Sequence, residues 1–576
     1  TNNLNVMLTK KHLGKQNKTK HKHLQKMEIQ PIGTLAQDTR GDDKHANTHL
    51  RWNLLWLVFT VGVVPLGLWL GFISPWAQMI VMLSLGGLGL MIMTVCSINV
   101  VRAVVSMRRD CKMDWKEKFD DERKGQLVLE EIETGKQIRM EDILHIAFMV
   151  AYNEPIAVIR QSLDSIACQT QAKQIIVVVA FEKSTKDLDK KIQDLKEGYK
   201  SSFHSLMFTA HPRNWSGVRE IPGKCSNANY AMRSITSYLE SKGMYDEERL
   251  TITSLDTDTI FPPRYFENLA YQFLTRDDKF HVFWQGMLAY NFHLADRPFF
   301  CRCISLFRSA FMIGLLIPFN INPMSVFSLS LKLAREARFS HPFYQMDDLT
   351  LFTSATSAAK CRIQITPINM PVVCGPTSGA SYFEEIKEWY KQGKRWTIGA
   401  AEVLHYICIK GRTLPRTAYI RFLMVFMIYY GFVLCSMTLT GLLSFVGTLY
   451  QPSVGPDSAI YIYIGLGMYA VNYVLYLVIL WMDKAIVRML EEMEMVEQHR
   501  ERVGYIQGFM HWLMMFPSLA MYSVVEYIAL WEITIYGKKV CGHKAAAKDG
   551  IAPKETKENM LSLEKEVSTV HADPAE

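Results

Sequence analysis

Residues 250–259 read LTITSLDTDT, a short apolar run that ends in two aspartates, Asp256 and Asp258. The aliphatic and β-branched residues predict a buried strand, and both aspartate side chains leave the same face because a strand has period two. Two carboxylates placed where a strand gives way to a loop can hold a divalent cation beside a nucleotide diphosphate. The alternative is a solvated loop, which is the usual context of an isolated Asp-x-Asp.

Four other strand-like runs alternate with helical patterns between residues 143 and 400, at 143–151, 174–180, 205–209 and 281–285. Strands separated by crossover helices predict an α/β domain with a largely parallel sheet that is covered on both faces. Ligand sites in such sheets gather at the carboxyl ends of the strands, which is where the two aspartates lie.

Long apolar runs flank the α/β region on both sides. Residues 52–72 and 76–101 are each long enough to cross a bilayer, which takes about 20 residues, and the turn 73–75 joins them into a hairpin. Basic residues precede the first run and follow the second, so the positive-inside rule places both ends of the hairpin in the cytosol. The α/β domain that follows is therefore expected to be cytosolic.

Three more apolar runs come after the α/β region, at 422–446, 459–481 and 505–530. The loop 451–458 has no basic residue and is expected outside, whereas 483–502 carries basic residues and is expected in the cytosol. Pro517 divides the last run and a Lys-rich tail follows it, which favours either a re-entrant pair or one more crossing. The amphipathic stretch 304–319 either lies in the membrane interface or forms a buried core helix.

The composition averages a polar, globular part and a lipid-soluble part, with 49% hydrophobic residues and a net charge of +8. Lysines concentrate in the first fifty positions, which are expected to form a disordered tail that either touches anionic lipid or only solubilises the chain. No folded basic patch or known motif accompanies the tail, so we expect no nucleic-acid partner. The eleven cysteines lack C-x-x-C pairs and metal-ligand spacing, which argues against structural zinc and a disulfide framework.

A second acidic motif lies at 345–349, QMDDL. Two adjacent carboxylates are not expected to face one pocket together, so one would act as a base for an acceptor hydroxyl while the other orients or caps the following helix. The alternative is a helix cap alone, and Asp348 suits either task.

A third motif lies within YKQGKRWTIG at 390–399, where Gln392, Arg395 and Trp396 are spaced i, i+3 and i+4. This spacing puts an amide, a guanidinium and an indole on one face of a helix, close to a membrane surface. The alternative is an Arg and a Trp that pack or snorkel at the surface.

Five motifs thus occur in order between the apolar runs: AYNEP (151–155), GKCSNAN (223–229), DTD (256–258), MDD (346–348) and QGKRW (392–396). This order resembles the processive family 2 glycosyltransferases, which include cellulose, chitin and hyaluronan synthases. The motifs cover about residues 151–396, and the flanking runs extend the likeness over most of the chain. The resemblance implies a GT-A fold, which is a Rossmann-like α/β glycosyltransferase domain, combined with an α-helical transmembrane domain.

The resemblance also implies a role for each motif. The residues that correspond to the nucleotide pocket are Tyr152, Asn153, Glu154, Lys224, Asn227, Asn229 and Asp256. Asp256 and Asp258 correspond to the site of the diphosphate and of its Mg²⁺ or Mn²⁺ cofactor. The MDD motif corresponds to the catalytic base, and Gln392, Arg395 and Trp396 correspond to the motif that holds the diphosphate and the acceptor end of the glycan.

Two departures from the family pattern affect these roles. Where the family places Asp-Asp-Gly to hold the nucleobase, this chain reads AFEK at 180–183, and Glu182 is the carboxylate that would replace it. The family's T-E-D is MDD here, so the acid pair is kept and the base is Asp348, the preferred assignment, or Asp347.

The implied function is that of a membrane-embedded inverting hexosyltransferase that uses a UDP-sugar donor to extend a glycan acceptor and move it through the lipid bilayer. One alternative is a nonprocessive enzyme that acts on a lipid or a short glycan, and another is a noncatalytic transporter or scaffold. The multi-pass protein is expected in the plasma membrane or the Golgi. The predicted segments are a basic tail (1–50), a transmembrane hairpin (51–102), a cytosolic linker (103–142), the GT-A domain (143–400), an interfacial segment (401–421), C-terminal transmembrane helices (422–536) and a polar tail (537–576).

Overall fold

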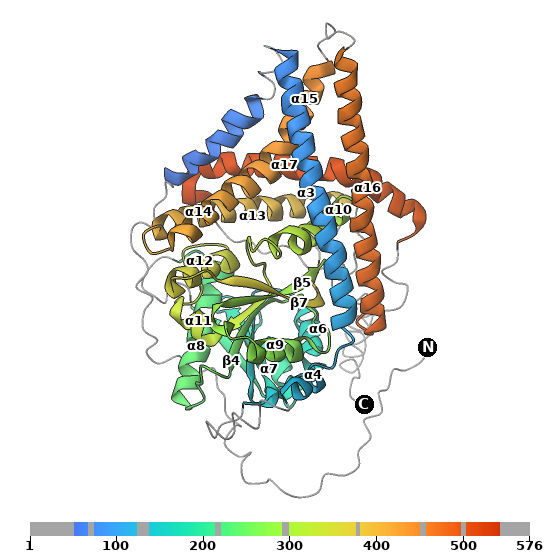
Figure 1. The fold of residues 1–576 in the computed structure, drawn as a ribbon. Helices are drawn as coiled ribbons and strands as arrows, with labels where there is room; N and C mark the ends of the chain where they lie inside the picture. Colours follow the sequence, from blue (N-terminus) through green and yellow to red (C-terminus); the bar gives the residue numbers. More distant parts are fainter. Residues whose placement is uncertain are drawn as a thin grey trace, which may run out of the picture.

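The computed structural model describes residues 51–66, 69, 74–123, 138–212, 220–290, 299–375, 381–449, 457–496 and 503–541. The predicted basic tail and the chain beyond Cys541 lie outside the described residues. Figure 1 shows an α/β domain below a group of long helices. One contiguous core of buried hydrophobic side chains runs through both parts.

A seven-stranded sheet forms the centre of the α/β domain, in the order β3-β2-β1-β4-β6-β5-β7. The strands are β1 (Leu144–Ala151), β2 (Ile175–Glu182), β3 (Ser205–His211), β4 (Leu250–Asp256), β5 (Val282–Ala289), β6 (Phe327–Ser330) and β7 (Gln364–Val373). β3, β2, β1 and β4 are parallel, whereas β6 runs antiparallel to β4 and β5. The five predicted strands and the α/β fold class are confirmed, and β6 makes the sheet mixed.

The sequence does not predict β6 and β7. β6 has only four residues, which is too short for a clear alternating pattern. β7 contains Pro367 and Pro371, and proline argues against a strand because it has no N–H to donate to the ladder. β7 tolerates both prolines because it lies at the edge of the sheet.

Helices connect the strands and cover the sheet (Figure 1). They are α6 (Ile156–Ala167), α7 (Leu188–Gly198), α8 (Lys224–Ser241), α9 (Tyr265–Thr275), α11 (Leu331–Glu336) and α12 (Asp347–Ala359). β2 and β5 are buried at every residue, as expected of strands covered on both faces.

Gly286 lies where β5 passes closest to its neighbours. A Cβ atom at this position would lie 2.8 Å from Cγ2 of Val372 on β7 and 3.3 Å from the ring of Tyr265 on α9. We expect Gly286→Ala to destabilise the fold by about 1–3 kcal/mol, because overpacking a filled core forces its neighbours to move. The thermal unfolding midpoint of the purified protein tests this, with Gly198→Ala as the control because no atom lies within 4 Å of its added Cβ.

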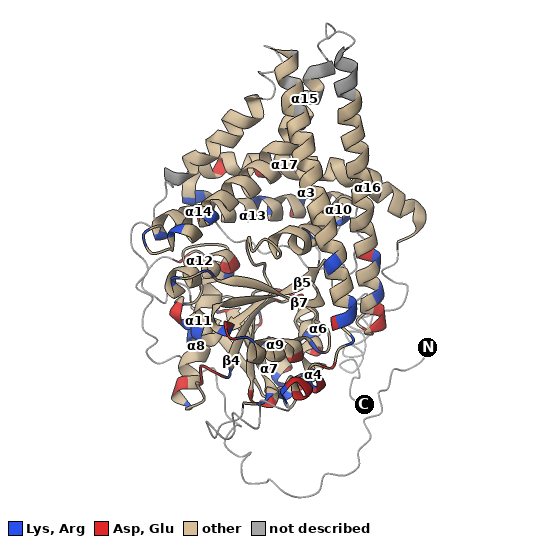
Figure 2. Ribbon diagram, viewed as in Figure 1, with Lys and Arg blue, Asp and Glu red and all other residues tan. Residues whose placement is uncertain are grey.

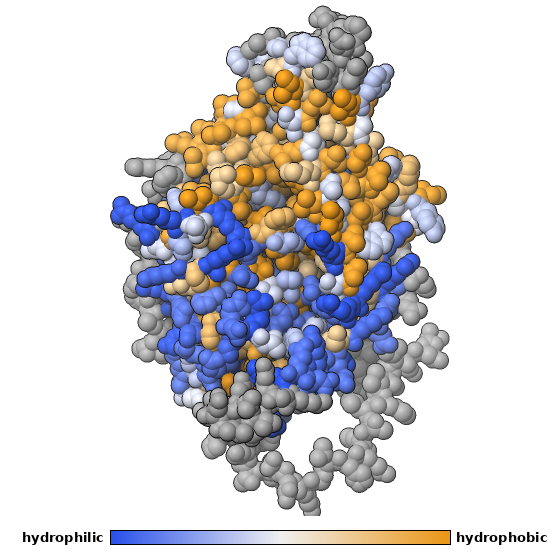
Figure 3. Space-filling model, viewed as in Figure 1, coloured by the Kyte–Doolittle hydropathy of each residue, from blue (hydrophilic) through white to orange (hydrophobic). Residues whose placement is uncertain are grey.

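Within the part of the chain that the structure describes, five helical segments are long and apolar enough to cross a membrane: Met79–Asp110, Phe299–Leu316, Arg416–Leu443, Tyr463–Glu492 and Tyr505–Val540. Figure 3 shows hydrophobic residues gathered over the upper helices and hydrophilic residues over the α/β domain. In Figure 2, charged residues also mark the lower ends of α3 (Pro75–Asp110) and α16 (Asp457–Glu492), beside the α/β domain. Asn53–Leu66 forms a shorter apolar helix, and most of the rest of the first predicted span lies outside the described residues.

Two apolar segments differ from upright spans. Most side chains of α10 (Phe299–Phe311) are buried in the protein, which favours the core-helix alternative for this stretch. α17 (Tyr505–Tyr536) continues through Pro517 as a single helix, so no re-entrant pair forms there. Figure 1 shows α17 crossing the upright α3 and α16, and it packs on α13 (Tyr382–Lys410). α13 and α10 both pack against α17, whereas the lower end of α3 packs directly on β7, where Nδ2 of Asn369 donates to Oδ2 of Asp110 at 3.0 Å.

Candidate active site

A cavity of about 760 Å³ lies between the carboxyl ends of the strands and the helices above them. All but one of the predicted site residues line it: Tyr152, Asn153, Glu154, Glu182, Lys224, Asn227, Asp256, Asp258, Asp347, Asp348, Gln392, Arg395 and Trp396. Asn229 is the exception, because it is buried within α8 and its Oδ1 accepts a hydrogen bond of 3.1 Å from Nε of Arg233. Residues from five separate motifs therefore meet at one place.

The loop after β1 is held in a defined shape. The backbone N–H of Tyr152 donates to Oε2 of Glu154 at 2.6 Å, and the Oδ1 atom of Asn153 accepts from the backbone N–H of Lys186 at 3.0 Å. β1 pairs in parallel with β4, and Val150 lies opposite Asp256. This pairing brings the loop beside the Asp-x-Asp motif.

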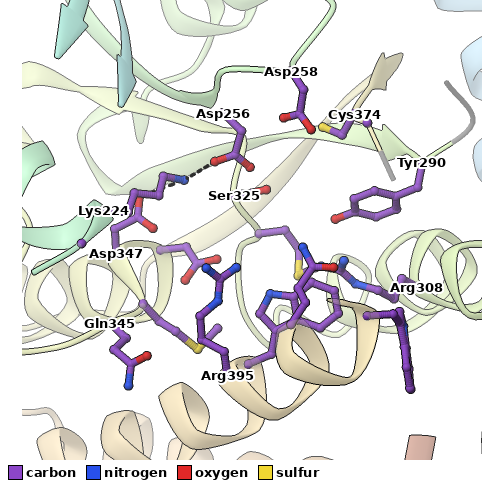
Figure 4. A pocket seen from close by; sticks show the side chains of 18 of the residues that line it. Lys224, Asp256, Asp258, Tyr290, Arg308, Ser325, Gln345, Asp347, Cys374 and Arg395 are labelled. Atoms are coloured by element: carbon purple, nitrogen blue, oxygen red, sulfur yellow. Dashed lines mark ion pairs between the residues drawn. The ribbon is translucent and has the colours of Figure 1, made fainter. Parts of the chain in front are cut away.

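Lys224 connects the two acidic motifs. It begins α8 directly after Gly223, whose φ of 151° lies in a region that favours glycine. Its Nζ lies 3.0 Å from Oδ1 of Asp256 and 3.3 Å from Oδ2 of Asp347 (Figure 4). Burial lowers the pKa of Lys224, but the carboxylates of Asp256 and Asp347 outweigh burial and raise it overall, so this lysine is charged.

Asp347 and Asp348 both line the cavity, which corrects the expectation that only one of them could face it. They are the first two residues of α12, where side chains from consecutive positions still reach the same opening. Asp347 is engaged by Lys224 and accepts a hydrogen bond of 3.3 Å from Oγ of Ser254. Asp348 accepts from the backbone N–H of Leu349 at 2.7 Å.

The surroundings of Asp348 favour the protonated form of its carboxyl group more strongly than the surroundings of an ordinary aspartate do. Burial and then the nearby charge of Asp347 raise the pKa of Asp348 to about 7, against an opposing effect of Lys224. A carboxyl group with this pKa can accept a proton near neutral pH, as a general base must.

The predicted helical face on α13 is confirmed, since Gln392, Arg395 and Trp396 all line the cavity from one helix. The guanidinium carbon of Arg308 on α10 lies 3.5 Å from the ring centre of Trp396 and 4.4 Å from that of Tyr290. Arg308 therefore covers one face of the indole, and Arg395 and Arg308 both bring positive charge to the cavity (Figure 4).

The sequence does not single out several other residues of the site. Arg308 and the aromatic residues Tyr290, Trp389, Tyr429, Tyr430 and Tyr522 also line the cavity. Trp389 lies three positions before Gln392 on α13, so the helical spacing of that motif could have indicated it. The others come from distant parts of the chain, so no local spacing marks them. Together they extend the cavity from the polar strand ends toward the apolar helices.

A buried carboxylate and histidine network also lies behind Glu182. Nδ1 of His211 is 3.1 Å from Oε2 of Glu182, and its Nε2 is 2.9 Å from Oε2 of Glu220. The sheet places His211 opposite Glu182, which only the register of β2 and β3 decides. Burial lowers the pKa of His211, but the two carboxylates outweigh burial and raise it to about 9. A protonated His211 thus holds Glu182 at the cavity wall.

The predicted ligands of a divalent cation, Asp256 and Asp258, both line the cavity. The described residues contain no group of three or more His, Cys, Asp or Glu residues that could hold a metal ion. Two carboxylates nevertheless fit Mg²⁺ or Mn²⁺ at a phosphate site, because substrate phosphates and water complete the coordination of such ions. Figure 4 shows both aspartates at the cavity, with Lys224 beside Asp256.

The solved structures similar to this chain include a mannosyltransferase and a glucosyl-3-phosphoglycerate synthase. A mannosyltransferase from Pyrobaculum calidifontis in complex with GDP-Man and Mn²⁺ is 12% identical with a TM-score of 0.35, over 79% of this chain and 99% of that one. Glucosyl-3-phosphoglycerate synthase from Mycobacterium tuberculosis, in complex with Mn²⁺, UDP and phosphoglyceric acid, is 13% identical with a TM-score of 0.29, over 50% of this chain and 83% of that one. No protein-family model and no curated protein matches the sequence. These likenesses are weak, so the assignment of function depends on the residues of the cavity.

Proposed function

We propose that this protein is a membrane-embedded inverting glycosyltransferase of the family 2 type, a hexosyltransferase that uses a nucleotide sugar, UDP-linked, to extend a polysaccharide. One observation carries the proposal: the cavity gathers two acidic motifs, a charged lysine and the Gln-x-x-Arg-Trp face beneath a layer of apolar helices. Each of these groups has a task in sugar transfer, and they come from distant parts of the chain.

Asp348 is the proposed general base. It takes the proton of an acceptor hydroxyl, whose oxygen then bonds to the anomeric carbon of the donor sugar on the face opposite the nucleotide. The bond between the anomeric carbon and the diphosphate oxygen breaks at the same time, so the configuration inverts. Asp347 is engaged by Lys224 and Ser254, which leaves it the task of positioning.

The diphosphate is proposed to lie near Lys224 and Arg395, whose positive charges stabilise the charge that develops on the leaving group. Asp256 and Asp258 would hold Mg²⁺ or Mn²⁺, which further neutralises that charge. Tyr152, Asn153, Glu154 and Glu182 border the part of the cavity proposed for the nucleoside, with Asn227 behind them. Nδ2 of Asn227 donates to the carbonyl of Ala180 at 3.0 Å, so this residue also ties α8 to β2.

The glycan acceptor is proposed to occupy the aromatic side of the cavity. Aromatic rings offer stacking faces to pyranose rings, and Trp389, Tyr429, Tyr430 and Tyr522 continue the cavity toward the apolar helices. This arrangement supports passage of the growing chain through the lipid bilayer. The charged lower ends of α3 and α16 lie on the side of the α/β domain, which supports a cytosolic catalytic domain (Figure 2). The plasma membrane or the Golgi is the proposed location.

Product length separates this proposal from a nonprocessive transferase acting on a lipid or short glycan. Purified protein in nanodiscs would be incubated with a panel of UDP-sugars and GDP-sugars in the presence of Mg²⁺ or Mn²⁺, and nucleoside diphosphate release and glycan size would be measured. We expect metal-dependent turnover of one UDP-sugar and a long product. A short product would favour the nonprocessive enzyme, and the absence of turnover from folded protein would favour a noncatalytic transporter or scaffold.

The pH dependence of turnover follows from the pKa of Asp348. A base must be ionised, so activity should rise with pH through a midpoint near 7, where Asp348 loses its proton. Removing the charge of Asp347 removes one cause of the raised pKa, so Asp347→Asn should move the midpoint to lower pH. Initial rates at saturating donor over about pH 5.5–8.5 test both expectations. An unchanged midpoint in Asp347→Asn would contradict this account of the acid limb.

A further inference from the structure

The short helix that follows α17 reaches the backbone that leads into Asp347 and Asp348. Lys538 lies in the short helix η10 (Gly537–Val540), and its Nζ donates to the carbonyl oxygen of Phe343 at 2.6 Å. The same ammonium lies 4.0 Å from the ring centre of Tyr344. A lysine from the last described element thus contacts two consecutive residues that lie four and three positions before Asp347.

Glu402 on α13 completes this contact from the other side. Its Oε1 lies 3.8 Å from Nζ of Lys538, and its Oε2 accepts a hydrogen bond of 3.2 Å from the backbone N–H of Gln345. The side chain of Glu402 is 0% exposed and that of Lys538 is 8% exposed. Burial raises the pKa of Glu402, and the positive charge of Lys538 opposes that effect. The pair is therefore a buried one, in which each charge depends on the other.

Gly399, one turn before Glu402 on α13, closely contacts Met346, which is the residue after Gln345. A Cβ atom on Gly399 would lie 2.5 Å from Cγ of Met346, so the helix passes directly over this side chain. Residues 343–346 are thus held by η10 at one end and by α13 along their length. Gln345 and Met346 line the cavity, whereas Lys538 and Glu402 are not among the described residues that do.

We infer that Lys538 and Glu402 are positioning residues of the transferase, which hold residues 343–346 so that Asp347 and Asp348 face the acceptor and Lys224. The inference rests on the proposed function, and it makes η10, which follows α17, part of the active centre. α13 also carries Gln392, Arg395 and Trp396, so the ion pair fixes Asp347 and Asp348 relative to the face proposed to bind the diphosphate and the acceptor.

Kinetics of Lys538→Met and Glu402→Gln test the inference, with Lys539→Met as the matched control because Lys539 is the exposed neighbour in the same helix. We expect kcat to fall by about 10- to 100-fold in both variants, since a small displacement of a catalytic group has this effect. The donor KM should change by less than about threefold, because the nucleotide contacts are elsewhere, and Lys539→Met should match the wild type. Equal kcat values in Lys538→Met and Lys539→Met would overturn the inference.

The double variant Lys538→Met/Glu402→Gln separates positioning from stability. Removing both charges leaves no unpaired buried charge, so its unfolding midpoint should recover toward the wild type. A kcat that stays low in this stable variant supports positioning, whereas a kcat that recovers together with stability would contradict it.

Hydrogen exchange gives a readout that does not depend on catalysis. The backbone amides of residues 343–348 should exchange faster in Lys538→Met than in Lys539→Met. If the wild-type protein shows no turnover, the proposed function fails, and equal exchange in the two variants would independently show that the ion pair does not hold this segment.

Discussion

Asp348→Asn is expected to reduce sugar transfer by roughly 10²- to 10⁴-fold, which is the usual contribution of a positioned general base. The substitution keeps the size of the side chain and removes its ability to take a proton from the acceptor hydroxyl. The residue lines the cavity and its pKa of about 7 suits proton transfer near neutral pH. Turnover with the preferred nucleotide sugar measures the loss directly.

Binding of UDP to Asp348→Asn provides the control, because this residue is not expected to contact the nucleotide. Its dissociation constant should stay within about threefold of the wild type while turnover is lost. The matched variant Asp347→Asn should keep measurable turnover. If Asp347→Asn is inactive and Asp348→Asn is active, the base is Asp347 and the assignment must be reversed.

Removal of the divalent cation is expected to reduce turnover to an extent comparable with Asp348→Asn. A cation at a leaving diphosphate is worth several kcal/mol, and each 1.36 kcal/mol is a factor of ten in rate, so chelation should lower turnover by roughly 10²- to 10³-fold or more. Asp256 and Asp258 line the cavity and are the proposed ligands of this cation. Asp258→Asn should therefore raise the Mn²⁺ concentration needed for half-maximal turnover.

A titration of turnover with Mn²⁺ after chelation tests the metal prediction. Asp277→Asn is a suitable control, because Asp277 is exposed in the same domain and is not among the described residues that line the cavity. Its Mn²⁺ dependence should equal that of the wild type. Full activity in the presence of a chelator would contradict a role for a cation at Asp256 and Asp258.

Local patterns in the sequence correctly predicted much of the α/β domain. The run before Asp256 and the apolar stretch of β2 are short, β-branched and bounded by turns, which identifies buried strands whatever surrounds them. The i, i+3, i+4 spacing on α13 likewise needs only helical geometry. The edge strand β7 escaped prediction, because its two prolines are acceptable only at a position that the sheet order creates.

The sequence by itself determined five of the seven strands, the apolar segments and the residue types of each motif, because these depend on spacing along the chain. The tertiary structure alone decided which groups meet. It set Lys224 between Asp256 and Asp347, placed Arg308 over Trp396 and brought Lys538 to Glu402. It also turned both adjacent aspartates toward one cavity. The same packing buries Asp348, and this burial is the main cause of its raised pKa. Such contacts join residues far apart in the chain, so packing and burial determine them and local spacing does not.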